Sequence, residues 1–197
     1  SSTDKKDFRS AIHPDTIKYL FDMGIEVIFE SGAGNGISTT DSKFEKIGAK
    51  SKSRDDCIRS SDILLSPGKL NDDEIMDMKS NSIFMGLLNP FINRQQFQQF
   101  KKRGNTAISM EFIPRITRAQ KMDVLSSQSN LAGYVAVIES AKLLNAALPM
   151  MMTAAGTLKP ANVFVIGVGV AGLQAIATAK RLGAKVEAFD TRPIVEE

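Results

Sequence analysis

The chain has 197 residues, of which 43% are hydrophobic and 24% are charged, a composition typical of a folded globular protein and not of a disordered one. Its 25 basic and 22 acidic side chains leave a formal net charge of +3. That charge is too small to indicate nucleic-acid binding, and no basic cluster is interleaved with aromatic residues. The length suffices for one domain, or for one domain and part of a second.

The chain offers few residues for metal binding or for a catalytic triad. Cys57 is the only cysteine, which excludes an internal disulfide and a cysteine-based metal cage. His13 is the only histidine, so a histidine metal site or a Ser-His-Asp triad lacks a partner residue. We therefore expect no metal site, and we expect His13 to cap the helix that begins at Pro14.

No segment is apolar over the roughly 18 residues that a membrane helix needs. The apolar stretch 146–155 is short and is interrupted by Pro149. Residues 1–7 lack the apolar centre of a signal peptide. The sequence therefore predicts a soluble segment.

The N-terminal half of the chain alternates helices with short apolar strands. Glycines 24, 48 and 104 follow the helix ends, as is usual for helix termination. We expect helices over residues 14–23, 41–48, 71–79 and 94–102, and strands over 25–29, 62–66, 82–85 and 106–110. This alternation predicts a parallel sheet covered by helices on both faces.

The pattern after Pro114 is helical from residue 117 to residue 148. Its apolar residues recur at the spacing of a buried stripe: Met122, Leu125, Leu131, Val135, Ile138 and Leu144. Gly133 is a weak point in this helix, Pro149 ends it, and residues 156–160 are predicted to be a linker.

A glycine-rich motif follows the next strand, predicted over 163–166. Gly167 permits the tight turn, Gly169 lets the backbone approach a pyrophosphate, and Gly172 lets helix and strand pack closely. A helix over 171–182 and a strand over 186–189 come next, and the strand ends in Asp190. A lone G-x-G-x-x-G is weak evidence, but this strand–turn–helix–strand–acid context indicates a dinucleotide site.

The helix start would offer free amides and a positive dipole end to the phosphates. Asp190 would accept the adenosine ribose hydroxyls and repel a 2′-phosphate, which favours NAD(H) over NADP(H). Arg192 keeps NADP(H) binding open as an alternative, because a nearby arginine can accommodate a 2′-phosphate. The other alternative is a glycine-rich turn of an unrelated α/β protein. The predicted cofactor-binding residues are Gly167, Gly169, Val170, Ala171, Gly172, Asp190, Thr191 and Arg192.

The predicted fold class is α/β, with two doubly wound parallel-sheet (Rossmann-like) domains of which the second is only partly present. We expect an N-terminal α/β domain over 1–116, a bridging helix over 117–150 and the start of the NAD-binding domain over 160–197. A second glycine cluster, Gly32-Ala-Gly34-Asn-Gly36, has no helix start and no acid at the right place, so we expect an ordinary loop there.

Two blocks of the chain resemble a known family. Residues 114–134, and residues 150–157 continued through Gly167 to 190–193, are similar to the NAD(H)-binding component of proton-translocating NAD(P) transhydrogenases. The segments 9–14 and 30–34 resemble both that component and alanine dehydrogenase, a relative with the same fold. The resemblance spans essentially the whole chain, although the family also has an initial strand and a mobile loop that this sequence does not include.

The resemblance implies a catalytic group made of Arg115, Gln120, Asp123 and Ser126, near the nicotinamide end of NAD(H). These residues would position the ring for hydride transfer. The residues alone are compatible, since Gln120, Asp123 and Ser126 step by three along a helix start. They are equally compatible with Asp123 and Ser126 as capping residues and Arg115 as a surface charge.

The resemblance also implies the reaction and the partners. Hydride would pass directly from NADH to NADP⁺ held on a partner component, and a membrane component would couple this transfer to proton movement. The chain would belong to a homodimer and to a soluble domain attached to a membrane-embedded complex.

Two alternatives remain open. An alanine dehydrogenase would need a lysine and a histidine in the first domain, where this chain has Gly68, with Lys69 beside it, and Leu88. Hydride exchange between two nicotinamides needs no general acid or base, so their absence favours transhydrogenation. The second alternative is a non-catalytic NAD-binding module.

Overall fold

The computed structural model describes residues 7–193 of the chain. The chain divides into two units, residues 1–115 and residues 116–197. Both units combine helices with parallel strands, which confirms the predicted α/β class.

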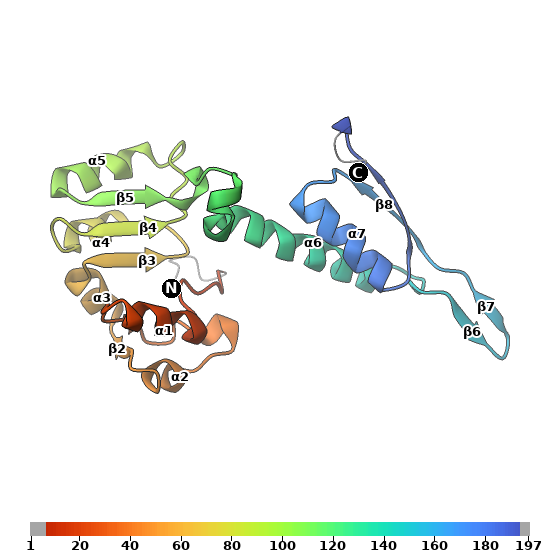
Figure 1. The fold of residues 1–197 in the computed structure, drawn as a ribbon, viewed down its shortest axis with the longest axis horizontal. Helices are drawn as coiled ribbons and strands as arrows, with labels where there is room; N and C mark the ends of the chain where they lie inside the picture. Colours follow the sequence, from red (N-terminus) through yellow and green to blue (C-terminus); the bar gives the residue numbers. More distant parts are fainter. Residues whose placement is uncertain (1–6, 194–197) are drawn as a thin grey trace. The chain divides into compact units, whose positions relative to one another are not determined.

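The described part of the first unit, residues 7–115, contains five short strands in two parallel sheets. One sheet pairs β1 (Ile28–Glu30) with β2 (Lys50–Lys52), and the other has the order β3 (Ile63–Ser66), β4 (Ile83–Gly86), β5 (Thr106–Ser109) (Figure 1). A cavity of about 590 Å³ is lined by residues of both β1 and β3. The helices are α1 (Pro14–Asp22), α2 (Asp41–Glu45), α3 (Arg54–Ser60), α4 (Asp72–Asp77) and α5 (Arg94–Arg103), with 3-10 turns η1 (Asn35–Ile37) and η2 (Met110–Phe112).

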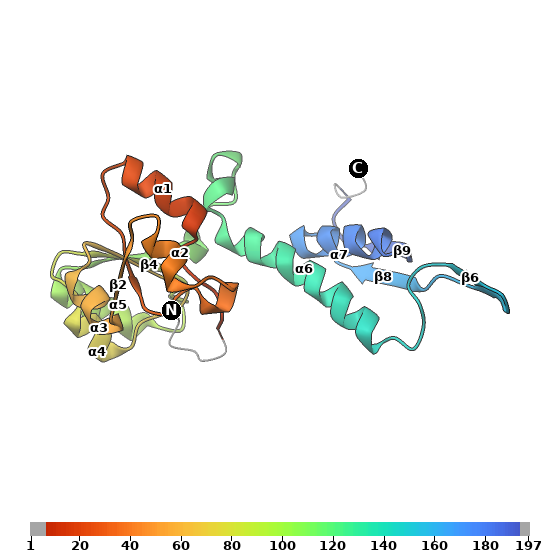
Figure 2. The same cartoon turned by 90° about the horizontal axis from the view of Figure 1, so that it is seen from below.

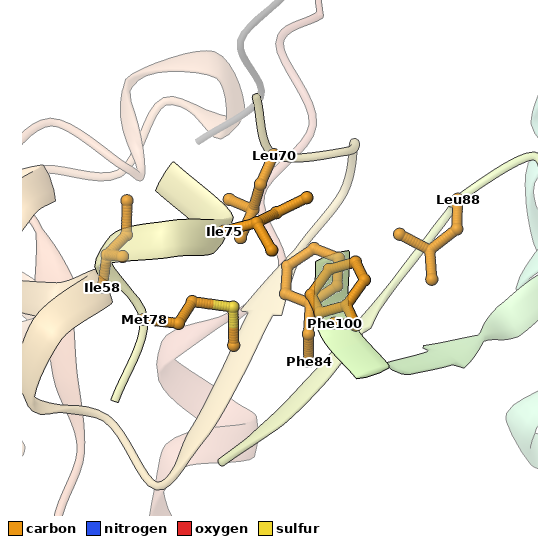
Figure 3. Close-up of a cluster of buried hydrophobic side chains, with 7 residues drawn as sticks. All are labelled: Ile58, Leu70, Ile75, Met78, Phe84, Leu88 and Phe100. Atoms are coloured by element: carbon orange, nitrogen blue, oxygen red, sulfur yellow. The ribbon is translucent and has the colours of Figure 1, made fainter. Parts of the chain in front are cut away.

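Two apolar clusters hold this unit together. The larger one packs α3, α4 and α5 against β4, and the rings of Phe84 and Phe100 stack at its centre with centroids 5.7 Å apart (Figure 3). The smaller one joins α1, β1 and α2 through Ile17, Phe29 and Phe44. The predicted helix-and-strand alternation thus closes around cores on both sheets.

Side-chain caps fix two helix starts. The His13 imidazole accepts a hydrogen bond from the Asp15 amide, while the Thr16 hydroxyl accepts one from the His13 amide. This confirms the capping role expected for His13. Asn71 and Glu74 form a complete capping box at α4 in the same way.

The sequence reading missed β2 and α3. The strand Lys50-Ser-Lys52 is polar and carries no apolar alternation. Helix α3 buries only Cys57 and Ile58, so it lacks the repeating stripe on which a helix prediction depends. Its start is nonetheless capped by Ser53, whose hydroxyl accepts a hydrogen bond from the Asp56 amide.

The second unit begins with a 3-10 helix and one long α-helix. It contains η3 (Thr117–Met122), α6 (Val124–Leu143), β6 (Met151–Thr153), β7 (Gly156–Leu158), β8 (Asn162–Ile166), α7 (Val170–Arg181) and β9 (Lys185–Phe189). Strands β8 and β9 are parallel neighbours, and α7 connects them (Figure 2). Strands β6 and β7 form an antiparallel hairpin.

Three expectations for this unit were wrong in detail. The single helix expected over 117–148 is divided at Asp123, because that residue caps the start of α6, and α6 ends at Leu143. Residues 156–158 of the linker expected over 156–160 form β7 of the hairpin, since Gly156 at φ 135° makes a tight reversal possible. The apolar stripe expected to be buried is largely exposed, Leu131 and Val135 by more than half.

The buried positions of α6 are Gly133 and Val137, because α6 packs against α7 along a different line. A Cβ atom on Gly133 would lie 2.1 Å from the backbone oxygen of Ala171, in the first turn of α7. Gly133 is therefore no weak point: it lets the two helix backbones approach more closely than any side chain would allow.

We predict that Gly133→Ala destabilises the protein. The added methyl group meets backbone atoms that cannot rotate away, and overpacking of this kind lowers the free energy of unfolding by about 1–3 kcal/mol. Thermal unfolding of the full-length protein measures this as a lower midpoint. Asn130→Ala, on the exposed part of the same helix, is the matched control and should leave the midpoint unchanged or slightly raised. An unchanged midpoint for Gly133→Ala would contradict the close helix contact.

Candidate functional site

The glycine-rich turn joins β8 to α7 as predicted. Gly167 has φ 91°, a conformation that side chains other than glycine rarely adopt. A Cβ atom on Gly172 would lie 1.9 Å from the backbone oxygen of Gly167, so α7 can begin beside the strand end only with glycine there. Gly169 is the N-cap residue of α7 and makes no side-chain cap, which leaves the first amides of the helix, including those of Val170 and Ala171, for a ligand.

Asp190 lies directly after β9 and is held against this turn. Its carboxylate accepts a 2.7 Å hydrogen bond from the Val168 amide, and its side chain is 6% exposed. The backbone amide of Gly167 donates to the Phe189 oxygen at 2.7 Å, so the turn is tied to the end of β9 twice. Val168 was missing from the predicted site, although its place after the first glycine of the motif could have indicated it.

Arg192 pairs with Asp190. Its Nε and Nη2 atoms each donate to one carboxylate oxygen at 2.9 Å, and its backbone amide donates at 2.9 Å as well. The Arg192 side chain, then its amide and that of Val168, hold the pKa of Asp190 well below its usual range. Asp190 is thus a carboxylate at every physiological pH. Thr191, between the two, is exposed.

A second polar group lies at the start of α6. The Asp123 carboxylate accepts hydrogen bonds from the Ser126 amide at 2.9 Å and from the Ser126 hydroxyl at 2.6 Å, and Asp123 is 7% exposed. Gln120 is exposed in η3, and its backbone oxygen accepts a hydrogen bond from the Asp123 amide. The structure therefore brings Gln120, Asp123 and Ser126 together, with Asp123 and Ser126 in a capping arrangement and not on one continuous helix face.

Arg115 is exposed and is the last residue of the first unit. Among the other positions of interest in that unit, Leu88 is 2% exposed and belongs to the core, and the Lys69 ammonium donates to the Asn93 side chain. The Glu111 carboxylate, which the sequence reading missed, accepts hydrogen bonds from the amides of Leu88 and Asn89. Burial raises the pKa of Glu111, but the hydrogen bonds from Ser109 and these amides outweigh it and lower the pKa.

The second glycine cluster forms an ordinary loop, as expected. Gly32 has φ 80°, its amide donates to the Asp41 carboxylate, and the following residues make the single turn η1. A Cβ atom on Gly36 would lie 1.9 Å from the Phe8 backbone oxygen, so that glycine serves close packing within the unit.

Family models match nearly the whole chain. The model of the alanine dehydrogenase/PNT N-terminal domain matches residues 3–132, and that of the alanine dehydrogenase/PNT C-terminal domain matches residues 136–197. The chain belongs to the alanine dehydrogenase/PNT family. The resemblance found in the sequence is thereby confirmed.

Known members of the family differ in how similar they are to this chain. It is 48% identical over 195 residues to an NAD(P) transhydrogenase subunit alpha protein of Rhodospirillum rubrum, an alignment that covers 96% of this chain and 51% of that protein. The crystal structure of transhydrogenase from Sinorhizobium meliloti superposes with a TM-score of 0.95 at 44% identity, over all of this chain and 59% of that one. An L-alanine dehydrogenase structure superposes with a TM-score of 0.85 at 25% identity, over all of this chain and 54% of that one. The chain thus spans about half the length of the curated relatives it matches.

Within residues 7–193, none of the helices combines the length and apolar character needed to cross a membrane. Over the same residues, no group of three or more His, Cys, Asp or Glu side chains is arranged to hold a metal ion.

Two substitutions at Asp123 test its capping role. Asp123→Ala removes the cap of α6, so we expect the free energy of unfolding to fall by about 1 kcal/mol. Asp123→Asn keeps a good capping side chain and should lose much less stability. Urea unfolding of the full-length protein measures both. Equal losses for the two variants would contradict the capping geometry.

Proposed function

We propose that this chain is the NAD(H)-binding part of a proton-translocating NAD(P) transhydrogenase. It would serve direct hydride transfer from NADH to NADP⁺, with NADP(H) held on a partner component. The observation that carries the proposal is the glycine-rich turn with the Asp190 carboxylate fixed beside it. The similarity to a transhydrogenase alpha subunit at 48% identity supports it independently.

The residues present fit a dinucleotide. The open start of α7 offers amides and the positive end of a helix dipole to a pyrophosphate. Gly169 carries no side chain that would hinder the approach, and the buried, ionised Asp190 offers acceptor oxygens to ribose hydroxyls. Thr191 and Arg192 extend this surface beyond the strand end.

The same carboxylate favours NAD(H) over NADP(H). A 2′-phosphate next to the Asp190 carboxylate would place two negative groups together, which is unfavourable. Asp190 and Arg192 together carry no net charge, so the pair offers a phosphate no net attraction. We therefore assign NADP(H) to a partner component.

Arg115, Gln120, Asp123 and Ser126 are proposed to position the nicotinamide ring. When bound, the cofactor supplies the hydride; the protein's part is proximity, orientation and exclusion of water. The Asp123–Ser126 pair is suited to orientation because each side chain restricts the other through the 2.6 Å hydrogen bond. The arrangement requires no residue that takes up or releases a proton.

The partners follow from the same proposal. A transhydrogenase needs an NADP(H)-binding component and a membrane component that couples hydride transfer to proton movement. We propose that the chain works within a homodimer, as a soluble domain attached to that membrane-embedded complex.

The specific rival is an amino-acid dehydrogenase of the alanine dehydrogenase type, which the TM-score of 0.85 to L-alanine dehydrogenase makes the natural second candidate. An amino-acid substrate needs proton-transferring groups in the first unit. There, Leu88 is a core residue, and Lys69 is engaged by Asn93. A non-catalytic NAD-binding module is the remaining rival.

We predict that the full-length protein, combined with its NADP(H)-binding component, transfers hydride from NADH to a NADP⁺ analogue of distinguishable absorbance. The reaction should depend on the partner component. NADH binding without any transfer would favour the non-catalytic module. NAD-dependent oxidation of L-alanine would favour the dehydrogenase and contradict our proposal.

We predict that Asp190→Ala weakens NADH binding by about tenfold to a hundredfold, because the ribose hydroxyls lose a charged acceptor. Titration calorimetry on the full-length protein measures the affinity. Lys159→Ala, at an exposed position before β8, is the control and should bind NADH normally. Unchanged affinity of Asp190→Ala would exclude Asp190 as the ribose ligand.

Arg115→Ala and Gln120→Ala are expected to behave differently from Asp190→Ala. Because they would orient the reacting ring, they should lower the transfer rate more than the NADH affinity. Single-turnover transfer rates and dissociation constants, measured on the same preparations, give the comparison. Loss of affinity with an unchanged rate would make them binding residues only.

A further inference from the structure

The hydrogen bonds on the Asp190 carboxylate fill both of its oxygens. Oδ1 accepts from the backbone amide and the Nε atom of Arg192, each at 2.9 Å. Oδ2 accepts from the Val168 amide at 2.7 Å and from Arg192 Nη2 at 2.9 Å. A carboxylate has about four acceptor positions, two on each oxygen. In this state no position remains for a ribose hydroxyl.

The four donors fall into two different pairs. Two are backbone amides, which hold the carboxylate in place whatever the side chains do. The other two belong to the single guanidinium of Arg192, whose side chain is 57% exposed. Each pair of donors gives one hydrogen bond to each carboxylate oxygen. If the guanidinium leaves, the carboxylate stays where it is and gains one open position on each oxygen.

The guanidinium also lies at the glycine-rich turn. Its Nη2 atom is 4.0 Å from the position that a Cβ atom on Gly169 would occupy. Arg192 therefore covers the side of Asp190 that faces the start of α7, where the proposed function places the dinucleotide.

We propose that the Arg192 side chain is a placeholder that occupies the two ribose-hydroxyl positions of Asp190 and is displaced by the adenosine ribose of NAD(H). The inference rests on the proposed function and adds a specificity device to it. A ribose diol carries two O–H donors on adjacent carbons, and the fork of Arg192 supplies two N–H donors to the same two oxygens. The exchange conserves the number of hydrogen bonds on the carboxylate.

This exchange of donors gives a reason for the presence of both Asp190 and Arg192. Without Arg192, two of the four donors to the carboxylate would be missing from the empty site, and water would have to supply them. With Arg192, the hydroxyls compete against an existing ion pair. Because that pair is more than half exposed on the arginine side, it is weak enough to be displaced. Arg192 thus reduces the part of the binding free energy that the ribose hydroxyls contribute.

The test compares two ligands on two proteins. Dissociation constants are measured by calorimetry on the full-length protein for NADH and for an NADH analogue that lacks the 2′-hydroxyl of the adenosine ribose. The ratio of the two constants reports the hydroxyl alone. Any attraction between Arg192 and the pyrophosphate acts equally on both ligands and cancels in this ratio.

In Arg192→Met the ratio should be larger than in the wild type by about threefold to tenfold, since the hydroxyl no longer replaces a charge-assisted bond. Arg192→Lys, which keeps the charge but has no fork, should give an intermediate ratio. Arg192→Gln is a second uncharged variant in case the methionine side chain disturbs folding, and its ratio should also exceed that of the wild type.

An equal or smaller ratio in both uncharged variants, with NADH still bound, would overturn the placeholder and leave the proposed function standing. Absence of NADH binding by the wild-type protein would overturn the proposed function and the placeholder together.

Discussion

The Asp190 carboxylate makes the contact on which the arrangement of the glycine-rich turn after β8 depends. It lies at the end of β9 and reaches the amide of Val168 in the turn after β8. Parallel pairing of the two strands brings their ends to the same edge of the sheet, and this hydrogen bond then fixes the turn against the neighbouring strand. Without it, the glycine-rich turn would be anchored to β9 only by the Gly167 amide, and the start of α7 would have greater freedom to move.

The family assignment makes this geometry informative about chemistry. A parallel strand pair with a glycine-rich turn occurs in proteins of many activities, so the fold alone does not select one. Membership of the alanine dehydrogenase/PNT family is the observation that supports a proposed role of this turn with a nicotinamide nucleotide. The proposed transhydrogenase function is favoured by the first unit, where Leu88 is a core residue and the Lys69 ammonium donates to Asn93.

Sequence reasoning identified most strands and helices because their apolar runs are short, distinct and separated by glycine or proline. It failed where structure rests on contacts distant in the chain. The polar strand β2 exists because β1 offers it a partner, and the exposed stripe of α6 was misjudged because the helix packs through Gly133, which leaves no mark in apolar periodicity. The spacing of Gly167 and Asp190 was sufficient to predict that they follow two neighbouring strands. The pairing of Arg192 with both carboxylate oxygens could not be predicted, since side-chain direction cannot be inferred from spacing.

The close contact at Gly133 fixes the position of α6 along α7. Backbone meets backbone there, so neither helix can slide along or roll over the other without opening a gap or producing a clash. From Gly133 to Asp123, α6 runs for ten residues, or about 15 Å of helix. The Asp123–Ser126 pair and the first turn of α7 are therefore expected to move as one rigid body. If the chain carries the proposed function, a motion that brings bound NADH toward its acceptor would move the Asp123–Ser126 pair and the first turn of α7 together.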